Sequence, residues 1–262
     1  MSDAPNPPVV ERAEWQSEID RLRTREKAHT REGDAIAAQR RRLPMVELDA
    51  STPLTGAHGD VTLLDAFEGR SQLFASYMMW YPGADAARQC EGCTKDIGQV
   101  LELGYLHSRD VTFAVLCAGP FEESSRYRDF MGWEMPWYAV PPGSQDALIA
   151  GRHFGMRVCY LRIGDRVFET YWTTGRGNEP MGSSYLMLDM TVYGRQEAWE
   201  DSPPGWPQKF FNTTSAQMRT DESGDAVDRP GGRPILQWSR VAAGRSDDLG
   251  SAGVMPAAHH HH

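Results

Sequence analysis

The 262-residue sequence has no long apolar run, little cysteine and no excess of positive charge. No window approaches the roughly 18 apolar residues of a membrane-spanning helix, and the first residues show neither the basic nor the apolar part of a signal peptide. We therefore expect a cytoplasmic protein that does not enter a membrane. The formal net charge of -9 argues against a nucleic-acid partner, because phosphate binding needs a concentrated basic surface.

The chain has 4 cysteines, which in the cytoplasm do not suggest a disulfide scaffold. Cys90 and Cys93 form a closely spaced C-x-x-C pair, which is more often catalytic or metal-binding. Cys117 and Cys159 lie far apart, each inside a predicted strand, and we expect them to be packing residues. The terminal histidines 259–262 read as part of a purification tag and support no metal site.

Hydrophobic patterning predicts an α/β core around this pair. Residues 72–80 are almost continuously apolar or aromatic, as in a central strand that is covered on both faces. The expected elements after it are helix 94–107, strand 111–117, helix 122–131, an aromatic and proline-rich loop at 133–142, a short helix at 146–154, and a hairpin of strands 156–163 and 166–172. Strand, C-x-x-C, helix, strand, helix and hairpin in this order predict one mixed sheet flanked by helices.

The two ends of the chain differ from this core. A mostly polar helix is predicted from residue 12 to about 42, and its apolar stripe consists of Trp15, Ile19 and Leu22. Such a sparse stripe cannot hold a helix alone, so we expect it to pack against the main domain or against a partner subunit. A homodimer is therefore a possible assembly.

The position of the cysteine pair suggests redox chemistry. A strand that ends in a loop places the first sulfur at a helix N-terminus, where free N–H groups and the helix dipole favour the thiolate. We assign Cys90 as the nucleophile and Cys93 as the resolving thiol. Arg88 and Lys95 add positive potential and Glu91 opposes it, which leaves the sign of the net effect open.

Several separated motifs resemble a known family. They are 26–34 with 39–44, Phe67-Glu-Gly-Arg-Ser-Gln-Leu73, the Cys90/Cys93 pair, Arg109-Asp-Val-Thr-Phe113, Met131-Gly-Trp-Glu-Met-Pro-Trp137, Tyr171 with Arg176-Gly177, and Leu188-Asp-Met-Thr-Val-Tyr-Gly-Arg195. Together they are similar to bacterial thioredoxin-like proteins described as dithiol-disulfide oxidoreductases. The resemblance covers about residues 11–197.

The resemblance implies a thioredoxin-like mixed sheet with added segments at both ends. We expect a helical extension at 11–44, the thioredoxin-like domain at 45–197, an irregular extension at 198–243, and a mobile tail with the tag at 244–262. Its substrate would be a small-molecule or protein thiol or disulfide.

Two departures from the thioredoxin pattern narrow the class of substrate that we expect. Thioredoxins carry a cis-proline before the strand that faces the cysteines, whereas the matching region here is Gly155-Met156-Arg157-Val158. The dipeptide between the cysteines is Glu-Gly, without a stiffening proline. We therefore expect a small or specific substrate instead of general protein-disulfide reduction. Trp80, Trp133, Trp137 and Arg157 are the candidate substrate-binding residues, although aromatic residues at this density could also fill the core.

Three other functions stay open. A peroxiredoxin-like thiol peroxidase would use Tyr81-Pro82 before Cys90 and Arg157 beside the thiolate, but Ala87 replaces its expected hydroxyl residue. A non-catalytic copper carrier would add His153 or His107 to the two thiolates. A structural partner protein would use neither cysteine. For the preferred redox function we expect no metal and no cofactor.

Overall fold

The two most apolar runs of the sequence form neighbouring central strands. β4 (Gln72–Met78) and β5 (Val111–Cys117) pair in parallel. The computed structural model describes residues 6–208, 210, 218–227 and 231–250, and it places these strands in an eight-stranded sheet of order β1-β8-β7-β4-β5-β6-β2-β3. Side chains of a strand alternate between the two faces, so a strand that is covered on both sides needs apolar residues at successive positions.

The other strands of this sheet are β1 (Val46–Leu48), β2 (Pro53–Gly56), β3 (Gly59–Thr62), β6 (Trp137–Ala139), β7 (Arg157–Ile163) and β8 (Arg166–Thr173). The helices up to residue 189 are α1 (Arg12–Arg40), α2 (Glu91–Gly98), α3 (Gly104–His107), α4 (Phe121–Met131), α5 (Pro142–Ile149) and α6 (Ser183–Asp189). Single 3-10 turns lie at η1 (Asp65–Phe67), η2 (Ala86–Arg88) and η3 (Gly175–Met181).

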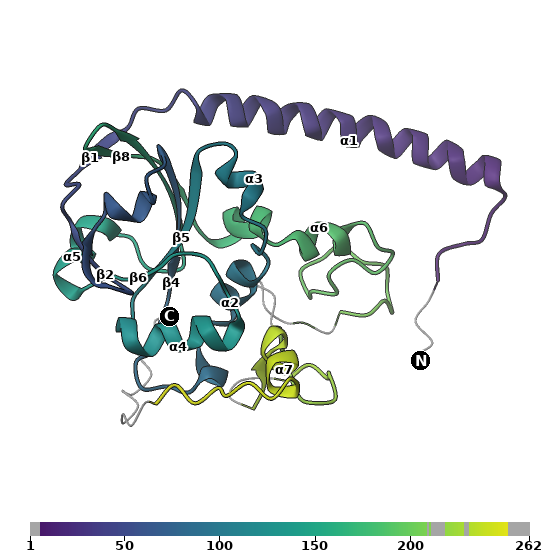
Figure 1. Ribbon diagram of the computed structural model, residues 1–262. Coiled ribbons are helices and arrows are strands. Elements are labelled where there is room, and N and C mark those ends of the chain that lie inside the picture. The colour runs from purple at the N-terminus through teal and green to yellow at the C-terminus, as the bar shows by residue number, and fades with distance from the viewer. Residues whose placement is uncertain (1–5, 209, 211–217, 228–230, 251–262) are drawn as a thin grey trace.

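The connection of the central strands defines the fold. A parallel β4–α2–β5 unit is followed by the β7–β8 hairpin, and β7 pairs antiparallel with β4 to give the order β8-β7-β4-β5. Figure 1 shows α2 and α4 on one side of this sheet. The domain therefore has the expected thioredoxin-like α/β fold. The hairpin is confirmed too, and Gly164 takes a positive φ of 61° in its turn.

Each face of the sheet carries its own apolar core. In β5, Ala114 and Leu116 join one core with the buried Tyr77 and Tyr160. Phe113, Val115 and Cys117 point to the other face, where α2 and α4 cover them. The alternation of neighbouring residues between the two cores explains why the whole strand is apolar.

Three expected elements differ from the structure. The short helix predicted at 146–154 is α5, which begins earlier, at Pro142, and ends at Ile149. The predicted helix 94–107 is two helices, since α2 ends at Gly98 and α3 begins only at Gly104. Glycine weakens a helix interior, and a Cβ on Gly98 would come within 2.6 Å of the Leu236 side chain. The predicted loop 133–142 contains β6, which extends the sheet beside β5.

The first helix leaves the domain. α1 has 29 residues and none of them is buried, and Figure 1 shows it as an arm that extends past the sheet. Near its end the Arg40 guanidinium lies 5.0 Å from the Tyr171 ring centre. The expectation that its apolar stripe packs on the main domain is therefore wrong, while packing on a partner stays a prediction. Among the described residues, no helix is long and apolar enough to cross a membrane.

The segment after residue 217 is more regular than expected. It contains β9 (Arg219–Thr220), β10 (Arg233–Pro234) and α7 (Ile235–Ala242), and α7 packs beside α4 (Figure 1). Leu249 is buried in the core under α4, although the sequence predicts a mobile tail from residue 244. The rest of that tail, 251–262, lies outside the described residues.

Candidate active site

The cysteine pair occupies the first turn of α2. Cys90 is the N-cap, and its Sγ accepts a hydrogen bond from the Cys93 backbone N–H at 3.4 Å. The helix begins earlier than the predicted residue 94, because Glu91 and Gly92 already belong to its first turn. A sulfur at this position faces the free N–H groups and the positive end of the helix dipole, which favour the thiolate.

The two thiols differ in accessibility. Both are thiols and not a disulfide; Cys90 is half-buried, whereas Cys93 is only 4% exposed. The pKa of Cys93 is raised well above its ordinary value, first by its hydrogen bond to Cys90, then by burial and by the charge of Cys90, while Arg157 acts in the opposite direction. Cys90 is thus the sulfur that an external molecule can reach, and Cys93 keeps its proton beside it.

A buried cluster of charges lies next to the pair. Asp96 accepts a hydrogen bond from the Arg157 guanidinium at 2.8 Å and forms an ion pair with Lys95 Nζ at 2.6 Å. Arg157 also donates to the Met156 carbonyl and to the Met181 sulfur, both at 2.9 Å. All three charged side chains are buried, so the loss of any one of them would leave a buried charge without its counter-charge.

These residues share a cavity of about 280 Å³. Its lining comes from four places: the residue after β4, the start of α2, the residues before and at the start of β7, and the segment from β8 to α6. The lining includes Met79, Cys90, Cys93, Asp96, His153, Gly155, Arg157, Asn178, Glu179 and Tyr185. The sequence-derived candidate Arg157 is therefore brought to the cysteines, and of the two histidines only His153 lines this cavity.

The tryptophans that were candidates for substrate binding lie elsewhere. Trp80, Trp133 and Trp137 are buried in the core under α4 and do not line the cavity. The rings of Trp133 and Trp137 stack at 6.0 Å, and Trp80 donates to Glu123 at 3.0 Å. The structure thus gives all three a packing position, because α4 covers them from the side away from the cavity.

Gly155, two residues before β7, forms part of the cavity wall. The next residue, Met156, does not line the cavity, and its carbonyl accepts a hydrogen bond from the Tyr77 N–H at 3.0 Å. Gly155 beside it has a positive φ of 97°, and a Cβ there would lie 3.3 Å from the Met79 sulfur. Asn178 donates to the Gly155 carbonyl at 2.8 Å, which ties η3 to this wall. The glycine keeps the cavity open next to Met79, whose Sδ lies 3.9 Å from Cys90 Sγ.

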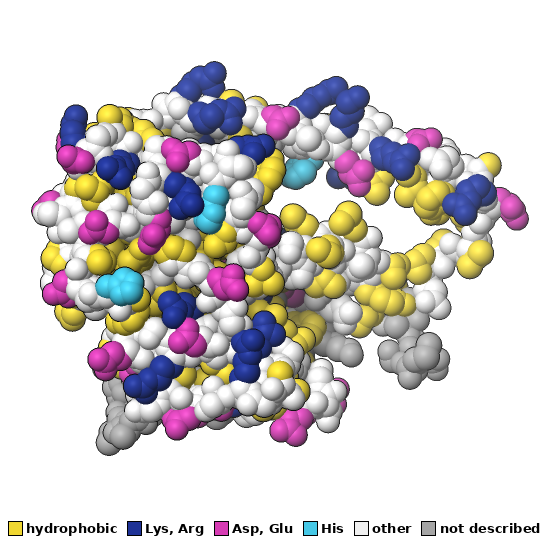
Figure 2. Space-filling model, in the orientation of Figure 1, with side chains coloured by type: hydrophobic (Ala, Val, Ile, Leu, Met, Phe, Trp, Pro, Cys, Tyr) yellow, Lys and Arg dark blue, Asp and Glu magenta, His cyan; other side chains and the backbone are white. Residues whose placement is uncertain are grey.

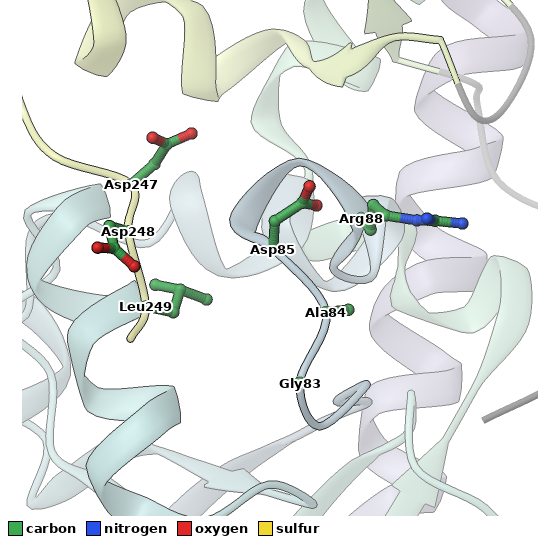
Figure 3. A pocket seen from close by; sticks show the side chains of 7 residues that line it. All are labelled: Gly83, Ala84, Asp85, Arg88, Asp247, Asp248 and Leu249. Carbon is green, nitrogen blue, oxygen red and sulfur yellow. The ribbon is translucent and has the colours of Figure 1, made fainter. Parts of the chain in front are cut away.

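A second hollow lies behind the cysteine loop. It has about 240 Å³ and is lined by residues 83–85, Arg88 and 247–249. Figure 3 shows Asp85 and Asp247 on its two sides and the Arg88 side chain directed away from residues 247–249. Across the described part of the chain, no group of three or more His, Cys, Asp or Glu side chains could hold a metal ion.

Sequence reasoning missed most of the cavity wall. Met79, Asn178 and Tyr185 carry no motif, and strand or loop patterning does not show that their segments meet. One signal was available: Lys95 and Asp96 lie two and three residues after Cys93, on a helix turn that has to pack against the sheet. Tyr185 covers the first of them, since Lys95 Nζ lies 3.6 Å from its ring centre.

Solved structures with some similarity are redox proteins at low identity. A protein assigned as the thiol:disulfide interchange protein DsbE from Chlorobium tepidum is 15% identical and covers 55% of this chain and 98% of its own, with a TM-score of 0.36. Peroxiredoxin Q from Xanthomonas campestris is 13% identical and covers 54% and 96%, with a TM-score of 0.35. Peroxiredoxin 6 from Arenicola marina is 15% identical and covers 62% and 81%, with a TM-score of 0.35.

These values are too low to carry a functional argument, so the fold rests on the strand order of this chain. No curated protein matches the sequence significantly. The family comparison does match, over residues 4–222, which is most of the chain. The protein belongs to the family described as "Bacterial protein of unknown function (DUF899)".

Proposed function

We propose that the protein is a dithiol-disulfide oxidoreductase in which Cys90 attacks and Cys93 resolves. The observation that carries the proposal is the asymmetry of the pair. Cys90 Sγ is reachable and accepts the Cys93 N–H at the start of α2, whereas the Cys93 thiol is buried and keeps its proton. A pair that is built in this way can attack in only one order.

The chemistry follows from that order. The Cys90 thiolate attacks one sulfur of a substrate disulfide, which forms a mixed disulfide and releases the first substrate thiolate. Cys93 then attacks Cys90 Sγ, and the Cys90–Cys93 disulfide forms while the second substrate thiolate leaves. The Cys93 proton passes to the released thiolate through water. Two thiols of the protein are oxidised and one substrate disulfide is reduced to two thiols.

The environment of Cys93 couples the two steps. Its raised pKa has three causes, and two of them, the hydrogen bond to Cys90 and the charge of Cys90, end when Cys90 enters the mixed disulfide. Arg157 then still acts to lower the pKa. Cys93 therefore becomes easier to deprotonate at the moment when its attack is needed, and it stays protonated before that.

The cavity favours a small or specific substrate. Its volume of about 280 Å³ suits a few residues or a small disulfide. The thioether of Met79, the ring of Tyr185 and the carboxylate of Glu179 offer both apolar and polar contacts. A thiol peroxidase is supported less well, because Ala87 has no hydroxyl and the Arg157 donors already bind Asp96, Met156 and Met181.

The test is a redox titration of the tag-free protein in glutathione buffers, followed by peptide mass spectrometry. We expect a Cys90–Cys93 disulfide that appears at a defined ratio of oxidised to reduced glutathione. Cys93→Ser should instead accumulate a mixed disulfide of Cys90 with glutathione, since the resolving sulfur is missing. If the intact protein forms no 90–93 disulfide at any ratio, the proposal is wrong.

Two matched variants complete the experiment. Cys159→Ser removes a half-buried thiol outside the cavity and should leave the titration unchanged. Cys90→Ser should abolish both the disulfide and the mixed disulfide. Rapid consumption of hydrogen peroxide that depends on Cys90 but not on Cys93 would favour the peroxidase instead.

A further inference from the structure

Arg219 lies outside the thioredoxin-like domain but reaches into the cysteine loop. It belongs to β9, and it is 3% exposed. Its guanidinium donates to the carbonyls of Ala87 and Gln89, the latter at 2.9 Å, so it holds the three-residue segment that leads to Cys90 at both of its ends. A third bond, to the Gly232 carbonyl at 2.9 Å, anchors the guanidinium on the neighbouring segment.

The same guanidinium meets the residue that follows Cys90. Arg219 Nε lies 2.9 Å from Glu91 Oε2 in an ion pair whose two members are both buried. The backbone N–H of Met218 donates to the other carboxylate oxygen of Glu91. Glu91 is therefore held by two successive residues of the C-terminal segment, and neither of them belongs to the charge cluster of Asp96.

Glu91 alone would weaken the nucleophile. A buried carboxylate one residue from Cys90 repels a second negative charge, and low local polarity strengthens that repulsion. An adjacent cation cancels it. The contacts of Arg219 with Ala87 and Gln89 also keep the loop in the geometry in which Cys90 Sγ accepts the Cys93 N–H.

We infer that Arg219 is a positioning residue that keeps Cys90 in its reactive thiolate form, by neutralising Glu91 and by holding the loop before Cys90. The inference rests on the proposed function for its biological meaning, and it adds a control on the nucleophile from outside the thioredoxin-like domain. The C-terminal segment then contributes to the reactivity of Cys90, although it lies outside the thioredoxin-like domain.

Several other groups also act on Cys90. The charged and titratable groups that face it are Glu91 and Cys93 on its own helix, Arg219 on β9, Tyr127 on α4, and, around the cavity, Arg157, His153, Glu179, Tyr185 and the Lys95–Asp96 pair. The Lys95, Asp96 and Arg157 charges are paired with one another. Variants that change only Glu91 and Arg219 leave all the other groups around Cys90 in place.

The test measures the rate at which iodoacetamide alkylates Cys90 as a function of pH, by peptide mass spectrometry on the full chain. Arg219→Met should shift the midpoint of the profile upward by about one pH unit and slow alkylation at neutral pH roughly tenfold. Glu91→Gln should shift the midpoint downward, because Arg219 then acts on Cys90 without its counter-charge. The double variant should return close to the original profile, and Arg219→Lys should stay near it.

A merely structural role gives a different pattern. In that case the Arg219→Met and Glu91→Gln midpoints both stay at the original value, although the melting temperatures fall, and the inference is wrong. If Arg219→Met does not fold, the downward shift in Glu91→Gln decides alone. Arg21→Met is the matched control, since this exposed cation pairs with Glu18 on the α1 arm that extends past the sheet (Figure 1), and its profile should not change.

Alkylation separates this inference from the proposed function. The reaction needs only the Cys90 thiolate, so the shifts can be measured even if no 90–93 disulfide ever forms. In turn, an unchanged alkylation midpoint in Arg219→Met would contradict the inference about Arg219. It would not contradict the proposed oxidoreductase function, which the redox titration of the cysteine pair tests separately.

Discussion

Two helices of this protein reverse the usual relation between polarity and burial. α1 carries Trp15 and Leu22, yet both are exposed and no residue of the helix is buried. α2 carries Glu91, Lys95 and Asp96, and all three are buried. Figure 2 shows hydrophobic side chains on the surface of the α1 arm beside its charged ones.

The difference shows what burial of a charge requires. Two of the three buried charges of α2 pair with a distant part of the chain: Asp96 with Arg157 on β7, and Glu91 with Arg219 on β9. The third, Lys95, pairs with Asp96 and lies over the distant Tyr185 ring. Among the described residues, no segment buries the apolar residues of α1. Whether a side chain is buried therefore depends on which segment faces it, and its own polarity decides less.

The largest expected effect is on the charge cluster of α2. Asp96→Asn leaves Lys95 and Arg157 buried without their counter-charge, so we expect the free energy of unfolding to fall by about 3–5 kcal/mol. Urea denaturation measures it. The matched variant Asp20→Asn on α1 removes an exposed carboxylate and should change the value by less than about 0.5 kcal/mol. If both variants lose the same free energy of unfolding, the buried charge of α2 is no more important for stability than the exposed charge of α1, and the comparison fails.

The next effect concerns alkaline pH and the core under α2. Burial raises the pKa of Cys117 from 9.0 to about 12. The unfolded chain loses this proton near its ordinary pKa while the folded chain keeps it, so its stabilising contribution is complete below pH 9.0 and is lost as the pH rises toward 12.

Cys117→Ala should therefore lose less stability than the original protein between about pH 8 and pH 10.5. Urea denaturation at both pH values gives the difference. Cys159→Ala should change the pH dependence over this range by nearly the same amount, because burial raises the pKa of that thiol to about 11, which is also above pH 10.5. An identical pH dependence in the original protein and in Cys117→Ala would contradict the argument.

The smallest effect is expected on α1. Leu22 is 48% exposed, so Leu22→Ala should change the free energy of unfolding by less than about 0.5 kcal/mol. Sedimentation velocity on the same variant and on the original chain tests the homodimer that the sparse stripe of α1 suggests. A loss above about 1.5 kcal/mol, together with a smaller sedimenting species, would mean that a second copy covers this helix in solution.

The sequence predicted the core of the fold well, because its signals there are local. The continuous apolar run 111–117 and the Gly164 turn depend on neighbouring residues, and both are confirmed by β5 and by the β7–β8 hairpin. The position of Cys90 before a helix was predicted on the same grounds. The helix start was missed by three residues, since Gly92 and Cys93 are weak helix formers.

The cysteine pair, its strand–loop–helix setting and the two apolar central strands are written into the sequence itself, since each depends on residues that are close along the chain. The electrostatics of the site are not. The tertiary structure alone placed Arg157 against Asp96, Arg219 against Glu91, and the three tryptophans in the core and away from the cavity. The physical reason is that ion pairing and burial act between segments that only folding brings together.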